Sequence, residues 1–263
     1  MKKNRKFGGK PRHSKKSENG FWIFGTHAVG EALQNDKRNK KRLVLSENAY
    51  NKLQQVVEKS KIVPEIVKPS VLNNLLEDTV HQGVALLVDP LDPFPLETML
   101  SENIDENTVS ILLFLDGVTD PHNIGAILRS AHVFGIKAVV TAWRHAPGET
   151  GVMAKSASGA MEHVPYVRVK NLSQSLALVK EYGYLTVCLD QHAGQPLETA
   201  DCKGYGGIVL VLGAEGCGTR SSTQLNCDVL HYIPPQAAPC SLNVSNAAAI
   251  AMYIAKNLAA KAA

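Results

Sequence analysis

The sequence has few cysteines and no long apolar run, and both features exclude classes of protein. The run VSILLFL at residues 109–115 is much shorter than the roughly 20 apolar residues that a membrane-spanning helix needs. The N-terminus is basic and no apolar stretch follows it, so we expect no secretory signal. These features predict a protein that neither crosses a membrane nor is secreted, and we expect a cytoplasmic location.

The cysteines and histidines show no pattern of disulfides or metal ligands. The cysteines are odd in number and none forms a Cys-x-x-Cys pair, which is typical of reduced thiols in a cytosolic protein. The histidines show neither HExxH nor a similar ligand spacing. We therefore expect no disulfide framework and no metal ion.

Two common nucleotide-binding signatures are also missing. The stretch GAEGCGTR at residues 213–220 is rich in glycine, but no Gly-Lys-Ser/Thr follows it. No GxGxxG follows a first strand either. These absences argue against a P-loop protein and a dinucleotide-binding protein. From its residues alone, the stretch fits a plain strand-to-helix turn as well as a ligand-binding loop.

Positive charge is concentrated at the N-terminus. Residues 1–20 contain eight Lys or Arg and one acidic residue, whereas the rest contains 20 basic and 23 acidic residues. We expect residues 1–20 to be disordered. They fit either a flexible arm that binds RNA phosphates or a tail that only aids solubility, and we favour the arm.

The rest of the chain alternates between strand and helix patterns. Residues 21–89 predict a small α/β domain, residues 90–109 a linker, and residues 110–263 a larger α/β domain. In the larger domain strands are expected at 111–116, 137–142, 164–169, 184–189, 208–213 and 229–233, and helices at 123–134, about 150–160, 173–182, around 221–226 and 241–261. Strands separated by helices predict a parallel sheet that is covered on both faces.

Three polar stretches stand next to these predicted strands. LDGVTDPHNIGAILRSA (115–131) follows the first strand of the larger domain, and Asn123 can cap the next helix. On spacing alone, Arg129 fits an ordinary surface residue better than a ligand-binding one. GAEGCGTR is the second stretch. The third is IPPQAAPCSLNVSNAAAIA (233–251), with more polar residues than a helix cap needs, so that some could line a pocket.

Together and in this order, the three stretches resemble motifs 1, 2 and 3 of the SpoU/TrmH-type ribose 2′-O-methyltransferases of the SPOUT superfamily. The resemblance covers residues 110–263. Residues 21–89, with FGTHAVGEAL and VHQGVALLV, are similar to the small α/β substrate-binding domain of the ribosomal RNA branch. The resemblance implies a parallel α/β sheet with a C-terminal trefoil knot, S-adenosylmethionine as cofactor, and a homodimer.

The resemblance also implies which residues form the site. The residues at the catalytic positions are Asn123, Arg129, Glu215, Ser241 and Asn243. The residues expected to contact the cofactor are Leu212, Gly213, Gly216, Ile233, Pro234 and Leu242.

The family suggests two roles for Arg129, as the base or as an anchor for the substrate phosphate. A guanidinium group stays protonated in nearly all proteins, so an arginine base is chemically awkward. We therefore expect Arg129 to bind the phosphate and lower the pKa of the ribose hydroxyl, and we leave the proton acceptor open. Asn123 would orient Arg129 or the ribose, and the other three residues would maintain the pocket.

The third motif departs from the family pattern at Pro235, Ala237 and Pro239. We expect altered cofactor affinity there. All five polar motif residues are present, so the sequence predicts an active enzyme that methylates RNA, with a guanosine of 23S ribosomal RNA as the expected target. The alternatives are a transfer-RNA ribose methyltransferase, which the extra domain at 21–89 disfavours, and a catalytically silent RNA-binding factor of ribosome assembly.

Overall fold

The computed structural model describes residues 20–77, 79–101, 109–144, 146–235 and 241–262. The predictions for the basic tail therefore lie almost wholly outside the described residues. Within the described ranges, no helix has the length and apolar character to cross a bilayer. The same ranges contain no group of three or more His, Cys, Asp or Glu side chains that could hold a metal ion.

The N-terminal part contains a four-stranded mixed sheet with the strand order β1-β4-β2-β3. Strand β4 is antiparallel to both of its neighbours, and all five of its residues are buried because it lies inside the sheet. The strands are β1 (Phe21–Phe24), β2 (Lys40–Leu45), β3 (Pro64–Ile66) and β4 (Val84–Val88), and the helices are α1 (Thr26–Gln34), α2 (Glu47–Ser60) and α3 (Pro69–Leu75).

The C-terminal part contains a six-stranded sheet with the order β10-β8-β9-β5-β6-β7, and every pairing in it is parallel. The strands are β5 (Ser110–Asp116), β6 (Ala138–Ala142), β7 (Tyr166–Val169), β8 (Tyr184–Leu189), β9 (Gly207–Gly213) and β10 (Val229–His231). The helices are α4 (Leu96–Ser101), α5 (Pro121–Phe134), α6 (Gly151–Ala157), α7 (Leu172–Glu181), α8 (Ser221–Gln224) and α9 (Val244–Ala262), with short 3-10 turns at Ala160–Glu162 and Leu197–Thr199.

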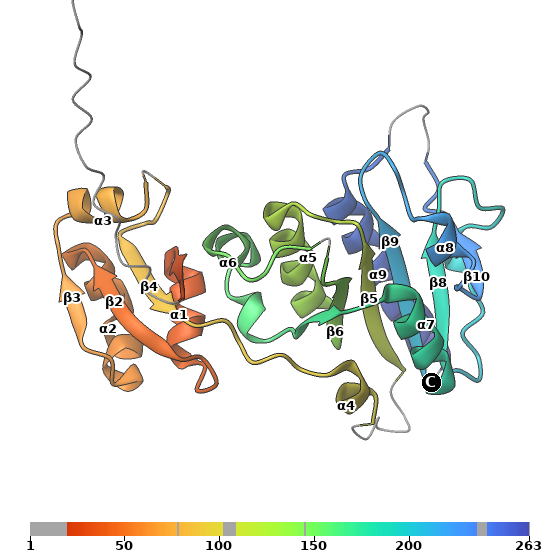
Figure 1. Ribbon diagram of the computed structural model, residues 1–263, viewed down its shortest axis with the longest axis horizontal. Helices are drawn as coiled ribbons and strands as arrows, with labels where there is room; N and C mark the ends of the chain where they lie inside the picture. Colours follow the sequence, from red (N-terminus) through yellow and green to blue (C-terminus); the bar gives the residue numbers. More distant parts are fainter. Residues whose placement is uncertain (1–19, 78, 102–108, 145, 236–240, 263) are drawn as a thin grey trace, which may run out of the picture.

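Helices cover both faces of this sheet, which confirms the predicted architecture (Figure 1). Alternate residues of β5 enter different cores, since successive side chains of a strand point to opposite faces. Leu113 and Leu115 pack with α5 and α9, whereas Leu112 and Phe114 pack with α4 and α7. The parallel sheet is therefore closed to solvent on both sides, and its strand ends are left for loops.

Two predicted helix starts differ from the structure, and at α5 the reason is that a different residue provides the cap. Asp120 caps α5 by accepting a hydrogen bond of 2.9 Å from the His122 amide, so Asn123 lies inside the helix instead. Helix α9 begins at Val244, three residues later than expected. The domain boundaries stay predictions. The knot does too, because residues 236–240 lie outside the described residues.

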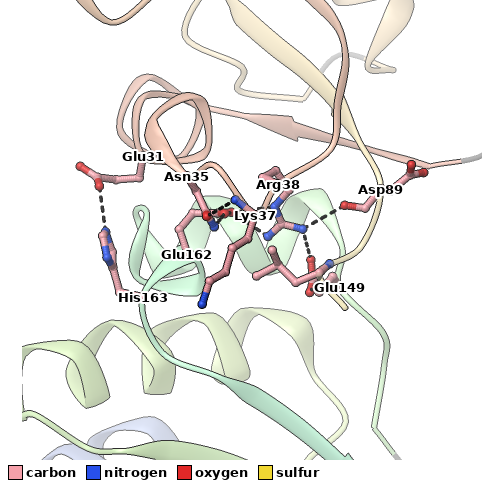
Figure 2. Close-up of polar contacts among 9 residues, drawn as sticks. Glu31, Asn35, Lys37, Arg38, Asp89, Glu149, Glu162 and His163 are labelled. Carbon is pink, nitrogen blue, oxygen red and sulfur yellow. Dashed lines mark hydrogen bonds and ion pairs between the residues drawn. The ribbon is translucent and has the colours of Figure 1, made fainter. Parts of the chain in front are cut away.

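A buried arginine joins the two parts of the chain (Figure 2). Arg38, in the turn between α1 and β2, has a side chain with no exposed surface. Its guanidinium donates to Glu162 at 2.7 and 3.1 Å, to Glu149 at 2.5 Å and to the Asp89 carbonyl at 3.1 Å. Both carboxylates belong to the C-terminal part, so this buried cluster fixes how the two sheets sit against each other.

The close approach of α6 to β1 adds a second constraint at the same joint. A Cβ atom on Gly151 would lie 2.2 Å from the Trp22 carbonyl oxygen, so only glycine fits at the start of α6. Beyond this contact, His163 and Glu31 bridge the two parts at 2.8 Å (Figure 2). The N-terminal sheet is thus held by a packed and hydrogen-bonded surface as well as by the chain that connects it.

We predict that Arg38→Met lowers the free energy of unfolding by about 3–5 kcal/mol, because it leaves two buried carboxylates without their counter-charge. Arg42→Met is the matched control, since the Arg42–Glu65 pair has side chains that are 40% and 47% exposed. Its loss is expected to be at most about 1 kcal/mol. Urea unfolding of both variants measures the difference, and equal losses would contradict the role assigned to Arg38.

Candidate active site

The central feature of the site is a buried carboxylate where β5 ends. Asp116 is 1% exposed and pairs in register with Gly213 at the end of β9. It accepts hydrogen bonds from the Arg220 amide at 3.0 Å, the Arg220 Nε at 2.8 Å and the Thr223 hydroxyl at 2.7 Å. The carboxylate therefore ties the loop after β5 to the start of α8, more than a hundred residues later.

Burial raises the pKa of Asp116, but its hydrogen bonds have the larger combined effect. The donors are the Arg220 side chain, the Thr223 hydroxyl and the Arg220 amide, and the nearby guanidinium charge acts in the same direction. The net pKa lies below the ordinary value, because each of these contacts favours the ionised form. Both oxygens of the Asp116 carboxylate accept hydrogen bonds from Arg220 or Thr223. We therefore interpret Asp116 as a charged structural group and not as a catalytic one.

The glycine-rich loop after β9 folds back on itself. The Gly218 amide donates to the Ala214 carbonyl at 2.9 Å, and Gly216 and Gly218 adopt positive φ angles of 80° and 64°. Gly213 allows this closure, since a Cβ there would lie 1.9 Å from the Gly218 carbonyl carbon. The tip of the loop, including Glu215, is left exposed to solvent.

Asn243 connects three elements through one side chain. Its Nδ2 donates to Asn123 Oδ1 at 3.2 Å and to Glu215 Oε2 at 3.3 Å. Its Oδ1 accepts from the Ser245 amide at 2.9 Å, which starts α9. Three of the five residues expected at catalytic positions are therefore brought together, from α5, the β9 loop and the start of α9.

The other two residues expected at catalytic positions lie outside this cluster. Arg129 is exposed on α5, nearly two turns beyond Asn123, and Ser241 is exposed two residues before Asn243. In the described ranges, neither side chain forms a hydrogen bond or an ion pair. Their polar groups are thus available to a ligand or to a second chain.

The residues expected to contact the cofactor differ in what they expose. Leu212 is 3% exposed, so it can contribute mainly its backbone. A Cβ on Gly216 would meet no atom within 4 Å, which leaves the backbone there open to a ligand. Leu242 is 48% exposed, Pro234 is exposed and Ile233 is half-buried. Apolar side chains beside accessible peptide groups suit an adenosine moiety.

One prediction about this surface falls outside what is described. Ala237 and Pro239 belong to residues 236–240, so the expected effect of these departures stays a prediction.

Sequence reasoning missed Asp116 and its hydrogen-bond partners Arg220 and Thr223. An acidic residue that directly follows a run of buried apolar residues needs a counter-charge or several donors. That rule predicts that Asp116 has a partner, but it does not identify Arg220 among the basic residues of the chain.

The sequence matches known protein families and a named relative. Residues 110–253 match the SpoU rRNA Methylase family, and residues 22–94 match the RNA 2′-O ribose methyltransferase substrate binding family. The chain is 37% identical over 234 residues to the 23S rRNA (guanosine-2′-O-)-methyltransferase RlmB of Coxiella burnetii. That alignment covers 88% of this chain and 93% of the relative.

Two solved structures share the fold. The SpoU methyltransferase AviRb from Streptomyces viridochromogenes, in complex with the cofactor AdoMet, gives a TM-score of 0.74 at 21% identity and covers 94% of this chain and 93% of its own. The AdoMet-bound rRNA methyltransferase from Sinorhizobium meliloti gives 0.75 at 20% identity, with 91% and 87% covered.

We predict that Asp116→Asn lowers the free energy of unfolding at neutral pH by about 1–3 kcal/mol, since an amide cannot satisfy the same donors. The pKa of Asp116 is lowered from 3.8 in the folded protein, so its carboxylate stabilises the fold above that pH. This contribution is lost as the pH falls through the folded-state pKa. The difference in unfolding free energy between wild type and Asp116→Asn should therefore disappear in acid.

Asp120→Asn is the control for this measurement, because asparagine caps a helix about as well as aspartate. Urea unfolding at a series of pH values from neutral to strongly acidic provides the comparison. If the difference in unfolding free energy between wild type and Asp116→Asn does not narrow in acid, the Asp116 charge is not what stabilises the strand ends.

Proposed function

The chain belongs to the SpoU rRNA methylase family, and we propose on that premise that it transfers a methyl group from S-adenosylmethionine to a ribose 2′-hydroxyl of RNA. The proposed target is a guanosine of 23S ribosomal RNA, as in the relative from Coxiella burnetii. The observation that carries the proposal is that the side-chain amide of Asn243 donates to both Asn123 and Glu215, beside an open glycine loop.

The cofactor supplies an electrophilic methyl group on a sulfonium. The chain would hold it against the backbone at Gly213 and Gly216, and against the apolar side chains of Ile233, Pro234 and Leu242. The exposed leucine and the open peptide groups support this assignment. These residues would position the methyl group for transfer.

The ribose hydroxyl is a very weak acid, so its orientation and the loss of its proton both govern the rate. We assign Arg129 to the substrate phosphate, where a fixed positive charge also lowers the pKa of the neighbouring hydroxyl. Asn123 would orient the ribose or Arg129. Glu215 and Asn243 would maintain the pocket, and Ser241 would hydrogen-bond within it.

Residues 22–94 match a substrate-binding family of RNA ribose methyltransferases, and the similarity to the 23S rRNA methyltransferase of Coxiella burnetii supports a ribosomal RNA target over a transfer RNA. We propose residues 21–89 as the RNA-binding domain, residues 90–109 as the linker and residues 110–263 as the methyltransferase domain.

The four cysteines in the described ranges are free, which supports the cytoplasm as the compartment. A silent assembly factor remains the second candidate, and the departures at 235–239 are its support.

We further propose a homodimer that buries an apolar surface on α5 and α9. Val133, Ile250 and Tyr253 are 67%, 38% and 56% exposed, and the rings of Tyr253 and Phe134 are 6.1 Å apart. Large apolar side chains gathered on two packed helices are typical of a protein interface. Arg129 lies one turn before Val133, so a second copy would cover the open side of the site.

We predict that the purified protein methylates unmodified 23S ribosomal RNA with labelled S-adenosylmethionine. Arg129→Ala should lower kcat by about 10²- to 10³-fold, because the developing charge loses its donor. Arg129→Lys keeps the charge and loses the planar fork, so it should retain part of the activity. Calorimetry should give an unchanged Kd for the cofactor in both variants. Cofactor binding with saturating RNA and no methylation would favour the silent factor.

We predict that Tyr253→Asp converts the dimer to a monomer, since a charge in an apolar interface is strongly disfavoured. Leu225→Asp is the matched control, because Leu225 is 86% exposed and lies outside the α5–α9 surface. Sedimentation velocity should separate the two variants. A monomeric wild type, or a Tyr253→Asp protein that remains dimeric, would contradict the proposed interface.

A further inference from the structure

Trp143 is an exposed aromatic residue at the end of β6. The residue is 54% exposed, although tryptophan is usually well buried. Its amide donates to the Val169 carbonyl at 2.8 Å, so its backbone continues the pairing of β6 with β7. The backbone is thus anchored to the sheet, while much of the indole faces solvent.

Arg168 of β7 holds one side of the indole. Its guanidinium carbon lies 3.9 Å from the centre of the Trp143 ring. The Nη2 of Arg168 donates at 3.1 Å to the carbonyls of Trp143 and of Ala146, and these bonds fix the plane of the guanidinium. The cation–π contact therefore orients the ring, and a fixed aromatic ring loses little entropy when it binds a ligand.

The surroundings of this pair are positively charged. Arg144 directly follows Trp143, and Lys170 lies two residues after Arg168; both are exposed, and neither forms an ion pair within the described ranges. With Arg168, three cations thus lie on the two segments that carry the pair. Aromatic rings set among basic side chains are typical of surfaces that bind single-stranded nucleic acid.

The pair also lies at the same edge of the sheet as the candidate active site. Leu115 of β5 is in register with Thr141 of β6, which is in register with Arg168 of β7. Trp143 therefore stands one strand away from Asp116 and the turn that leads to Asn123, at a strand spacing of about 4.8 Å. Arg168 shares a sheet face with Tyr166, which packs in the same core as α5.

We propose that Trp143, backed by Arg168, is a stacking site for an unpaired RNA base next to the nucleotide that is methylated. The ring would bind the face of the base, while Arg144 and Lys170 would meet the adjacent phosphates. This inference rests on the proposed function in that the ligand is RNA. It adds a residue that positions the substrate and that makes no contact with the Asn123–Glu215–Asn243 cluster.

Fluorescence tests the stacking directly, because the chain has two tryptophans. Trp22→Phe leaves Trp143 as the single reporter. Titration with a single-stranded oligoadenylate should quench its emission to a plateau, and the Trp143→Phe protein should not show this quenching. The absence of quenching in the Trp22→Phe protein, under conditions where the oligonucleotide binds, would overturn the proposal.

Kinetics with unmodified 23S ribosomal RNA give the second test. Trp143→Ala should raise the KM for RNA by about 5- to 100-fold, the range expected for one lost base stack. Trp143→Phe should restore most of it, and the cofactor Kd should stay unchanged. Tyr205→Ala is the matched control, since Tyr205 is 39% exposed and lies at the opposite edge, just before β9 begins.

The two proposals fail in different ways. If the wild type does not methylate ribosomal RNA, the proposed function fails, and the fluorescence titration still reports on Trp143. If the wild type is active and Trp143→Ala has the same KM as Tyr205→Ala, the stacking site is wrong and the proposed function stands. Unfolding midpoints of all variants confirm that each comparison is made between folded proteins.

Discussion

The site depends on the pairing of one buried charge at the end of β5. Asp116 has almost no contact with water, so it must be compensated by donors from the protein. Arg220 and Thr223 provide them, and this holds the start of α8 against the end of β5. The glycine loop between β9 and α8 is then confined to the same edge, where Asn243 can reach both Glu215 and Asn123.

The same physical constraint joins the two parts of the molecule. Arg38 is as deeply buried as Asp116 and is compensated by Glu149 and Glu162 of the C-terminal part (Figure 2). The N-terminal part, which we propose binds RNA, is thereby held at a defined place relative to the proposed methyl-transfer site. With Trp143 on a neighbouring strand end, three separate regions define where one nucleotide of a folded RNA would lie.

The fold was largely predictable from the sequence, and the site was not. Apolar runs such as IVLVLG and the alternation with helices identify all six parallel strands. Asn123 was misplaced because Asp120 and Pro121, which precede it, form a better helix start. The contact between Asp116 and Arg220 spans 104 residues and depends on strand order, which no local pattern contains. Arg129 acquired a role only through the resemblance, since its spacing alone fits a surface residue.

The most direct test of the central claim is a map of ribose methylation over all ribosomal and transfer RNA, from cells that contain this protein and from cells that lack it. We expect one 2′-O-methylated guanosine of 23S ribosomal RNA to disappear without the protein and to return when the wild-type chain is restored. An unchanged 23S map, with or without a lost methyl group in a transfer RNA, would contradict the assignment.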